Sequence, residues 1–466
     1  MTALVWFRRD LRIRDNVALR AALDASDKVA PVFCFDERLY GGRHASGPRT
    51  QFLLESLAEL RRELRDRGGE LFVRRGRPEV ELAKLGKECG AESVHFAYDV
   101  SPFARKRGER TSKAFGDAGL EVHSHEGLNA VDVRGIETQA GKPYTVFSPF
   151  HRNWEGIERR DTLAAPREVP VPAGPNAGRL PTLEGLGLEQ EVTDPLRGGE
   201  SAGRNRLDAF LEADVEAYSD NHDALGRDRT SRLSPYLHFG CISPRQVEER
   251  LPPRGKGPAA FHRQLCWRDF YHHVLFHFPL NARSEYQPRY RGMKWSHAKK
   301  PFEAWCEGRT GYPLVDAGMR QLLAEGWMHN RARLVVGSFL TKDLGIDWRW
   351  GERHFMRYLI DGDEANNNGN WQWIASVGTD PSPYFRRIYN PTLQMERYDP
   401  DGTYVRKHVS ELAGVPAEHL REPWEMPEEV QREAGCLIGT DYPGPIVDHK
   451  EARQEAMARY RSATDG

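Results

Sequence analysis

The stretch ALVWFRRDLRIRDNVALRAALDASDKVAPVFCFD, residues 3–36, places two short apolar runs on either side of an amphipathic segment. The runs at 3–7 and 28–36 have the length and composition of buried strands. Residues 16–26 carry apolar side chains at the three- and four-residue spacing of a helix. A strand, a helix and a second strand in this order predict the repeating unit of a parallel sheet, and therefore an α/β fold.

The same alternation continues to about residue 126. Further strands are predicted at 70–76, 93–99 and 120–127, with amphipathic helices between them. These elements predict a doubly wound, parallel, five-stranded sheet with helices on both faces, and we assign residues 1–130 to this domain. No G-x-G-x-x-G follows the first strand and no P-loop sequence occurs, which argues against nicotinamide or ATP binding.

Beyond this domain the pattern changes twice. Five prolines between Pro166 and Pro181 prevent regular structure there, so residues 131–200 are predicted to form an interdomain connector. From about residue 201 onward, apolar side chains recur every three or four residues and strand-like runs are few. Residues 201–466 are therefore predicted to form a larger, all-helical domain.

Composition narrows the classes of protein to which the chain can belong. With 466 residues, 39% hydrophobic and 29% charged, it has the make-up of a globular protein of two or three domains. No apolar run is long enough to span a membrane, and no signal-peptide core is found, so we expect a cytoplasmic protein with no membrane partner. The net charge of −1 means that any DNA binding needs a local basic patch.

The cysteines and histidines give no metal-site pattern. The six cysteines are scattered without a Cys-x-x-Cys pair, which is typical of reduced thiols. His273 and His277 have a spacing compatible with zinc, but no third ligand is evident. We therefore expect no metal.

A second informative stretch is DGDEANNNGNWQW, Asp361–Trp373. Its glycines and asparagines are typical of a turn, but two tryptophans directly after them are not, because indoles are usually buried and need a partner for the N–H. Carboxylates, amides and flat apolar surface in one turn-and-helix would suit a planar heteroaromatic ligand such as a flavin. A buried polar turn explains the residues equally well.

This string resembles the flavin-binding signature of the photolyase/cryptochrome family, specifically that of class I cyclobutane pyrimidine dimer photolyases. Six other segments resemble family blocks in the family's order, and together they cover nearly the whole chain. These segments are WFRRDLRIRDN (6–16), TSRLSPYLHFG (230–240), WRDFYHH (267–273), TGYPLVDAGMRQL (310–322), GWMHNRAR (326–333) and DYPGPIVDHKEAR (441–453). The resemblance implies an α/β domain followed by a helical domain that binds FAD and DNA.

The resemblance implies a set of FAD contacts. Thr230–Ser234 match the segment that holds the flavin diphosphate, although an ordinary helix cap explains their hydroxyls as well. Arg333 and Asp361 match a charged pair beside the flavin ring. Asn367 matches the residue that faces flavin N5, and an amide there favours repair enzymes over plant and animal cryptochromes. The expected contacts are Tyr218, Thr230, Ser231, Leu233, Ser234, Arg268, Arg333, Asp361, Asp363 and Asn367.

The tryptophans are unusually concentrated, since eight of the eleven fall between Trp267 and Trp373. Trp295, Trp348 and Trp371 match the family's chain of three tryptophans that carries electrons from the surface to the flavin. Their spacing alone does not indicate this role, and each one by itself fits a hydrophobic core.

Further residues match the family's contacts to damaged DNA. Trp267 and Trp373 match the pair that brackets a flipped-out pyrimidine dimer. Asn330, Arg331 and the pair Arg386–Arg387 are expected near the DNA backbone or groove, although a pair of arginines is usually a solvated surface. The remaining predicted substrate contact is Gln264.

A second, light-harvesting chromophore is expected in the first domain. Where folate-binding members carry Asn-Glu, this sequence has Ser101-Pro102. Arg9, Arg49 and Asp99 match positions that contact a deazaflavin in other members, although capping or surface roles explain each of them. The resemblance places 8-hydroxy-5-deazaflavin first, a flavin second and no antenna third, and folate is not expected.

The expected activity is that of a deoxyribodipyrimidine photo-lyase. Light-excited reduced FAD donates an electron to a cyclobutane pyrimidine dimer in UV-damaged DNA, and the dimer splits. A monomer with no obligate protein partner is expected. A cryptochrome photoreceptor would typically add a C-terminal extension, and the chain ends soon after residue 453.

Gln264 is the position at which the sequence departs from class I enzymes, which carry a glutamate there. The amide is typical of six-four photolyases, the other alternative. Those enzymes need a histidine pair as proton shuttle, however, and the matching positions here are Asn330 and Leu334. We therefore expect dimer repair, with a lower quantum yield than that of a glutamate-bearing relative.

Overall fold

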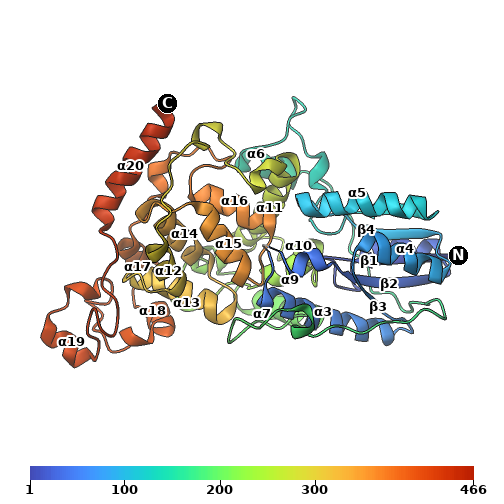
Figure 1. The fold of residues 1–466 in the computed structure, drawn as a ribbon, viewed down its shortest axis with the longest axis horizontal. Helices are drawn as coiled ribbons and strands as arrows, with labels where there is room; N and C mark the ends of the chain where they lie inside the picture. The colour runs from blue at the N-terminus through green and yellow to red at the C-terminus, as the bar shows by residue number, and fades with distance from the viewer. Residues whose placement is uncertain (43, 466) are drawn as a thin grey trace.

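The computed structural model describes residues 1–42 and 44–465, and its first domain is built on a five-stranded parallel sheet. The strand order is β3-β2-β1-β4-β5. The strands are β1 (Thr2–Phe7), β2 (Lys28–Phe35), β3 (Phe72–Arg75), β4 (Ser93–Ala97) and β5 (Glu121–His125). The predicted fold class, an α/β domain followed by a helical domain, is confirmed (Figure 1).

Side chains of the central strand alternate between two hydrophobic layers, as the two-residue period of a strand requires. Ala3, Val5 and Phe7 pack with α1 (Val17–Ala25) and α3 (Gly47–Arg65). Leu4 and Trp6 pack on the other face, against α4 (Pro78–Cys89) and α5 (Pro102–Asp117). Figure 1 shows α3 and α5 on opposite sides of the sheet. A short helix, α2 (Glu37–Tyr40), follows β2.

The segment between the sheet and the helical domain contains one α-helix, α6 (Phe147–Glu155), and the short turns η1 (Val133–Gly135) and η2 (Glu184–Leu186). The proline-rich part is irregular in the described structure, and it runs beside the sheet. The amide of Val29 donates to the Pro170 carbonyl, and that of Val73 to the Ala177 carbonyl, each at 2.7 Å. Backbone N–H groups of the strands that have no partner in a neighbouring strand are thus hydrogen-bonded to the connector.

The rest of the described chain is helical. Its α-helices are α7 (Glu200–Ala213), α8 (Tyr218–Asn221), α9 (Ser234–Phe239), α10 (Pro244–Arg250), α11 (Lys256–His277), α12 (Lys299–Glu307), α13 (Pro313–Glu325), α14 (Asn330–Ser338), α15 (Trp348–Tyr358), α16 (Glu364–Ile374), α17 (Pro391–Tyr398), α18 (Thr403–His408), α19 (Glu428–Ala434) and α20 (His449–Asp465). Shorter turns are η3 (Leu225–Arg227), η4 (Pro279–Ala282), η5 (Pro288–Tyr290), the π-helical η6 (Phe339–Asp343), η7 (Tyr384–Arg387), η8 (Ser410–Leu412) and η9 (Pro423–Glu425). None of the helices in residues 1–42 and 44–465 combines the length and apolarity that crossing a bilayer requires.

The two domains share one hydrophobic core. Leu207, Phe210, Tyr236 and Phe261 of the helical domain belong to the same cluster as the α3 face of the sheet. The two domains approach each other closely at Gly240, which ends α9 with φ 66°. A Cβ at this position would lie 2.0 Å from the Arg9 carbonyl oxygen. The loop after β1 is therefore held directly against the start of the helical domain.

Candidate functional site

A cavity of about 490 Å³ lies in the helical domain, close to this junction. Its lining comes from α8, α9, α11, α14, α15, α16 and the loops between them, together with Arg9 of the first domain. The structure brings all of the predicted FAD contacts to this one cavity: Tyr218, Thr230, Ser231, Leu233, Ser234, Arg268, Arg333, Asp361, Asp363 and Asn367. It brings five of the predicted substrate and DNA contacts to the same cavity, but not Arg386 or Arg387: Gln264, Trp267, Asn330, Arg331 and Trp373.

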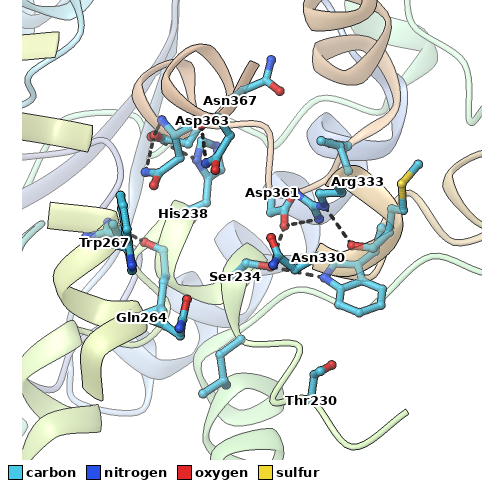
Figure 2. A pocket seen from close by; sticks show the side chains of 18 of the residues that line it. Thr230, Ser234, His238, Gln264, Trp267, Asn330, Arg333, Asp361, Asp363 and Asn367 are labelled. Carbon is cyan, nitrogen blue, oxygen red and sulfur yellow. Dashed lines mark hydrogen bonds and ion pairs between the residues drawn. The ribbon is translucent and has the colours of Figure 1, made fainter. Parts of the chain in front are cut away.

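The predicted charged pair forms at one wall (Figure 2). Asp361 Oδ2 accepts hydrogen bonds from Arg333 Nη2 at 2.8 Å and from Ser234 Oγ at 2.5 Å. The other oxygen, Oδ1, is buried and has no hydrogen-bond partner among the described residues. A buried acceptor without a donor is costly, so this oxygen fits a ligand that brings an N–H or O–H group, as a flavin does.

Asp363 begins α16 and joins the two domains. Its Oδ1 caps the helix, accepting from the backbone N–H of Asn366 at 2.8 Å, and its Oδ2 lies 2.5 Å from Arg9 Nη2. His272 Nε2 lies 3.2 Å from Oδ1. Burial raises the pKa of the Asp363 carboxyl, but Arg9 and His272 outweigh burial and hold this pKa well below its usual value. The carboxyl is therefore ionised, and its negative charge is matched by a cation from the first domain.

The hydroxyl-rich loop Thr230–Ser234 also lines the cavity, and its last residue, Ser234, contacts Asp361. Arg206 donates to the carbonyls of Thr230 and Ser231, with both distances 2.8 Å. Arg232 has φ 50°, so the chain turns sharply before α9. Thr230 Oγ1 is buried with no partner among the residues described. Like Asp361 Oδ1, this hydroxyl fits a polar ligand in the cavity.

The two indoles predicted to bracket a dimer each have one face covered by the protein. The ring of Trp267 stacks on Phe147 of α6, with a centroid distance of 3.6 Å and an interplanar angle of 2°. The guanidinium of Arg387 lies 3.9 Å from the centroid of Trp373, and Trp373 Nε1 donates to Asp380 at 2.9 Å. Both indoles also line the cavity, so each is held firmly and presents aromatic surface to it.

The arginines near the indoles have different roles. Arg331 lines the cavity and pairs with both oxygens of Asp223, with Nη2–Oδ2 at 2.5 Å. Arg387 is only 3% exposed, and it pairs with Asp380 and donates to the Trp373 carbonyl. The prediction that Arg387 contacts DNA is therefore wrong, because its charge is used inside the protein to hold Trp373. Arg386 is exposed.

The three tryptophans of the predicted chain belong to one hydrophobic core. Trp371 lines the cavity, Trp348 is 0% exposed, and Trp295 is half-buried at the margin of the core. Trp348 Nε1 lies 3.4 Å from Glu285 Oε1. The three side chains thus lie at the cavity, in the core and at the margin of the core, which is the order that an electron chain requires. Their role in electron transfer stays a prediction.

The residues predicted to hold an antenna lie at the domain interface. Arg9 reaches Asp99 at 3.5 Å as well as Asp363, and it lines the main cavity. Arg49 Nη1 donates to the carbonyls of Met356 at 2.7 Å and Leu359 at 3.2 Å. These side chains are used to join the domains, so the structure gives them a role that the resemblance did not predict.

Sequence reasoning missed two residues at the site. His238 lines the cavity, and burial followed by the charge of Arg9 lowers the pKa of its imidazole to about 4. It stands four residues after Ser234 in a segment already singled out, so helical spacing could have identified it. Phe147 belongs to the predicted connector, where FSPFHRNWE carries aromatics at helical spacing.

His273, the candidate zinc ligand, has both ring nitrogens bonded to backbone groups of Val133 and Tyr144.

Comparisons with known proteins agree with this site. The DNA photolyase family matches residues 3–173, and the FAD binding domain of DNA photolyase matches residues 261–462. A deoxyribodipyrimidine photo-lyase of Streptomyces griseus is 44% identical, over 97% of this chain and 97% of its own length. A cryptochrome DASH of Natronomonas pharaonis is 38% identical, over 98% of this chain and all of its own.

Solved structures show the same fold. A bacterial class III photolyase from Agrobacterium tumefaciens has a TM-score of 0.94 and 36% identity, covering 100% of this chain and 98% of that one. An archaeal photolyase from Sulfolobus tokodaii with two FAD molecules has a TM-score of 0.86 and 31% identity, covering 99% and 100%. Because a class III photolyase and a DASH cryptochrome are both among these relatives, the prediction of class I is not supported. The fold, the cavity and the extent of these matches together show that the chain belongs to the DNA photolyase/cryptochrome family.

Proposed function

We propose that the protein is a light-driven DNA repair enzyme that splits cyclobutane pyrimidine dimers, with FAD in the cavity described above. One observation carries the proposal: the Asp361–Arg333 pair and the indoles of Trp267 and Trp373 line the same cavity. The cofactor and the flipped-out bases of the lesion would therefore lie next to each other. Reduced FAD, when bound, supplies the electron that light excitation makes available to open the dimer.

The chain's own residues hold the cofactor and the lesion. Asp361 and Thr230 each provide a buried oxygen that lacks a partner among the described residues, and these are proposed to bind the flavin end and the diphosphate end. Extruding the lesion from the duplex costs a few kcal/mol. Stacking on Trp267 and Trp373 recovers about 1–3 kcal/mol for each base. Phe147 and Arg387 keep the two indoles in place for this purpose.

UV-damaged DNA is the proposed partner, bound by a monomer. Arg331 is one of several arginines that line the cavity, and its guanidinium pairs with Asp223 in the DNA-free protein. We propose that it contacts the DNA backbone. Trp267→Ala should weaken binding of dimer-containing DNA by about 1–3 kcal/mol and leave undamaged DNA nearly unchanged. Arg331→Ala should weaken both and reduce the salt dependence. Equal losses on both DNAs for Trp267→Ala would remove this indole from the lesion pocket.

We propose in addition that a second chromophore binds in the first domain. The family resemblance favours 8-hydroxy-5-deazaflavin, and the Sulfolobus tokodaii photolyase with two FAD molecules supports a flavin as the second choice. Release of the bound chromophores by denaturation, followed by their absorption spectra and masses, distinguishes these two. A single FAD per chain would remove the antenna from the proposal.

Illumination of the purified, reduced protein with defined DNA lesions tests the activity. We expect loss of thymine dimers in the light, none in the dark, and no repair of six-four lesions. Repair of six-four lesions alone would identify the other repair activity. Binding of FAD without repair of either lesion would favour a photoreceptor.

A further inference from the structure

Glu285 is a buried carboxylate in contact with Trp348, the middle residue of the predicted tryptophan chain. Glu285 is 2% exposed and Trp348 is 0% exposed. The indole Nε1 of Trp348 donates to Glu285 Oε1 at 3.4 Å. The other carboxylate oxygen, Oε2, accepts from Arg349 Nη2 at 2.6 Å. Because burying a carboxylate is costly unless its oxygens are hydrogen-bonded, these two partners fix the carboxylate beside the indole.

The charged groups beside Trp348 carry a net negative charge. The Arg349 guanidinium lies 4.8 Å from the centroid of the Trp348 ring and would by itself oppose a positive charge there. It pairs with two carboxylates, however, with Glu285 at 2.6 Å and with Asp347 at 3.1 Å. Within residues 1–42 and 44–465 neither carboxylate forms an ion pair with a second cation. The three groups therefore carry one negative charge together, and a positive charge on the indole would be attracted to it.

Trp295, at the outer end of the predicted chain, has the opposite surroundings. Its Nε1 is buried and has no hydrogen-bond partner among the described residues. The guanidinium of Arg459 lies 5.6 Å from the centroid of its ring. Arg459 donates to the Thr341 carbonyl and forms no ion pair in the part of the chain that the structure describes. A positive charge on Trp295 would therefore face a cation that no carboxylate offsets, with no acceptor at its N–H.

The backbone places Trp348 between the other two indoles. Trp348 precedes Gly351 by about one turn of α15, and a Cβ at Gly351 would lie 2.2 Å from the Trp371 ring. Trp295 adjoins the segment just before α15, to which the amide of Ser296 donates a backbone hydrogen bond of 2.8 Å. A positive charge that leaves Trp371 therefore reaches Trp348 before it reaches Trp295.

We infer that Glu285 makes Trp348, rather than Trp295, the residue on which the positive charge of photoreduction comes to rest. The inference rests on the proposed function, because this charge arises when bound FAD is photoreduced. In the step, Trp348 gives one electron to the Trp371 radical cation. Trp371 becomes neutral, Trp348 becomes the radical cation, and no atom is transferred. The oxidised residue is then enclosed by protein, where reductants in solution do not touch it.

Pulsed electron paramagnetic resonance of the illuminated, FAD-loaded protein locates the tryptophan radical by its magnetic coupling to the cofactor, which weakens with distance. The wild type and Trp295→Phe should show the same coupling and the same radical lifetime. Glu285→Gln keeps a hydrogen-bond acceptor but removes the charge, so the radical should move to Trp295 and its coupling should weaken. Glu285→Gln combined with Trp295→Phe should shorten the radical lifetime by about tenfold or more, because neither indole then stabilises the charge.

Glu191→Gln is the matched control. Glu191 pairs at 2.6 Å with Arg357 of the same helix α15, and that guanidinium lies over Tyr358. The variant thus removes one carboxylate from a comparable ion pair and should behave as the wild type does.

FAD retention and circular dichroism show that the variants are folded. A weaker coupling in the wild type than in Trp295→Phe, or loss of the radical in Trp295→Phe, would place the charge on Trp295 and overturn this inference alone. Unchanged coupling in Glu285→Gln would also overturn it, since the charge of Glu285 would then have no effect. Absence of any tryptophan radical in the wild type would overturn the predicted chain as well.

Discussion

At the scale of single residues, Trp371 is the member of the predicted tryptophan chain that lines the cavity. Trp371→Phe should abolish rapid photoreduction of oxidised FAD, because a phenyl ring is much harder to oxidise than an indole. The chemically pre-reduced variant should still repair dimers. Flash photolysis measures the first result and dimer loss under continuous light the second. Trp327→Phe, which changes another indole of the lining, should photoreduce normally, whereas unchanged photoreduction in Trp371→Phe would exclude the chain.

Gln264 is exposed on α11, three residues before Trp267, and both side chains line the cavity (Figure 2). A protonated carboxyl can donate a hydrogen bond to a carbonyl that gains negative charge and can release its proton, whereas an amide can only donate. Gln264→Glu should therefore raise the number of dimers repaired per absorbed photon, with little change in dimer affinity. The measurement uses saturating DNA and matched flavin reduction. A lower yield in the variant would show that the amide is the better group here.

The sequence predicts which residues line the cavity better than it predicts which of them contact each other. The predicted FAD contacts lie in short segments that resemble family blocks, so their common location follows from the resemblance. The resemblance assigns Arg9 to an antenna, but Arg9 pairs with Asp363, a residue 354 positions away. No local pattern reveals a partner at that distance. The role of Arg387 also depends on tertiary structure, because neighbouring arginines look alike in a sequence although one is exposed and the other buried.

At the scale of elements, α15 packs directly against α16 at Gly351. A Cβ there would lie 2.2 Å from the Trp371 ring. Gly351→Ala should lower the free energy of unfolding by about 1–3 kcal/mol and reduce FAD retention, because a packed indole cannot yield without moving the helix. Denaturant unfolding and flavin content measure the two effects.

The control for this substitution is Gly108, a glycine of α5 where an added Cβ would have no neighbouring atom within 4 Å. Gly108→Ala should be neutral or stabilising, by up to about 1 kcal/mol, since alanine favours helix formation. Equal stability of Gly351→Ala and the wild type would show that the two helices can separate freely.

The strands of the sheet are predicted within a few residues because each one is a short apolar run between helix-forming segments. The helix α6 is not predicted, because prolines farther along the same connector dominate its composition. Its position against α11 depends on the stacking of Phe147 on Trp267, a contact that neither segment shows on its own. The π-helical turn η6 is likewise not predicted, since its sequence differs little from that of an ordinary helix.

At the scale of the whole molecule, buried histidines make stability depend on pH. Burial lowers the pKa from 6.5 to about 4 for His95, His238, His273, His329, His354 and His408. The unfolded chain binds these protons near pH 6.5 and the folded chain only near pH 4. Between these values the unfolded state holds more protons, so the free energy of unfolding falls as the pH falls. Each unit of pKa difference corresponds to about 1.4 kcal/mol.

Thermal unfolding between neutral pH and about pH 5 measures this loss. The ring of His354 packs among Phe302, Trp305 and Tyr358, so a phenyl ring can replace it. His354→Phe should lose less stability on acidification than the wild type does. An identical loss in the two proteins would mean that the pKa of His354 is the same in the folded and unfolded states.

The ion pair between Arg9 and Asp363 has a consequence for the order of events during synthesis. Because 354 residues separate the two, a ribosome working at about 5–20 residues per second makes the second about 20 to 70 s after the first. The α/β domain therefore has time to fold, and to position the side chain of Arg9, before α16 has been synthesised. Cofactor uptake must then wait until α16 has been made, because the residues that line the cavity extend along the chain as far as Ile374.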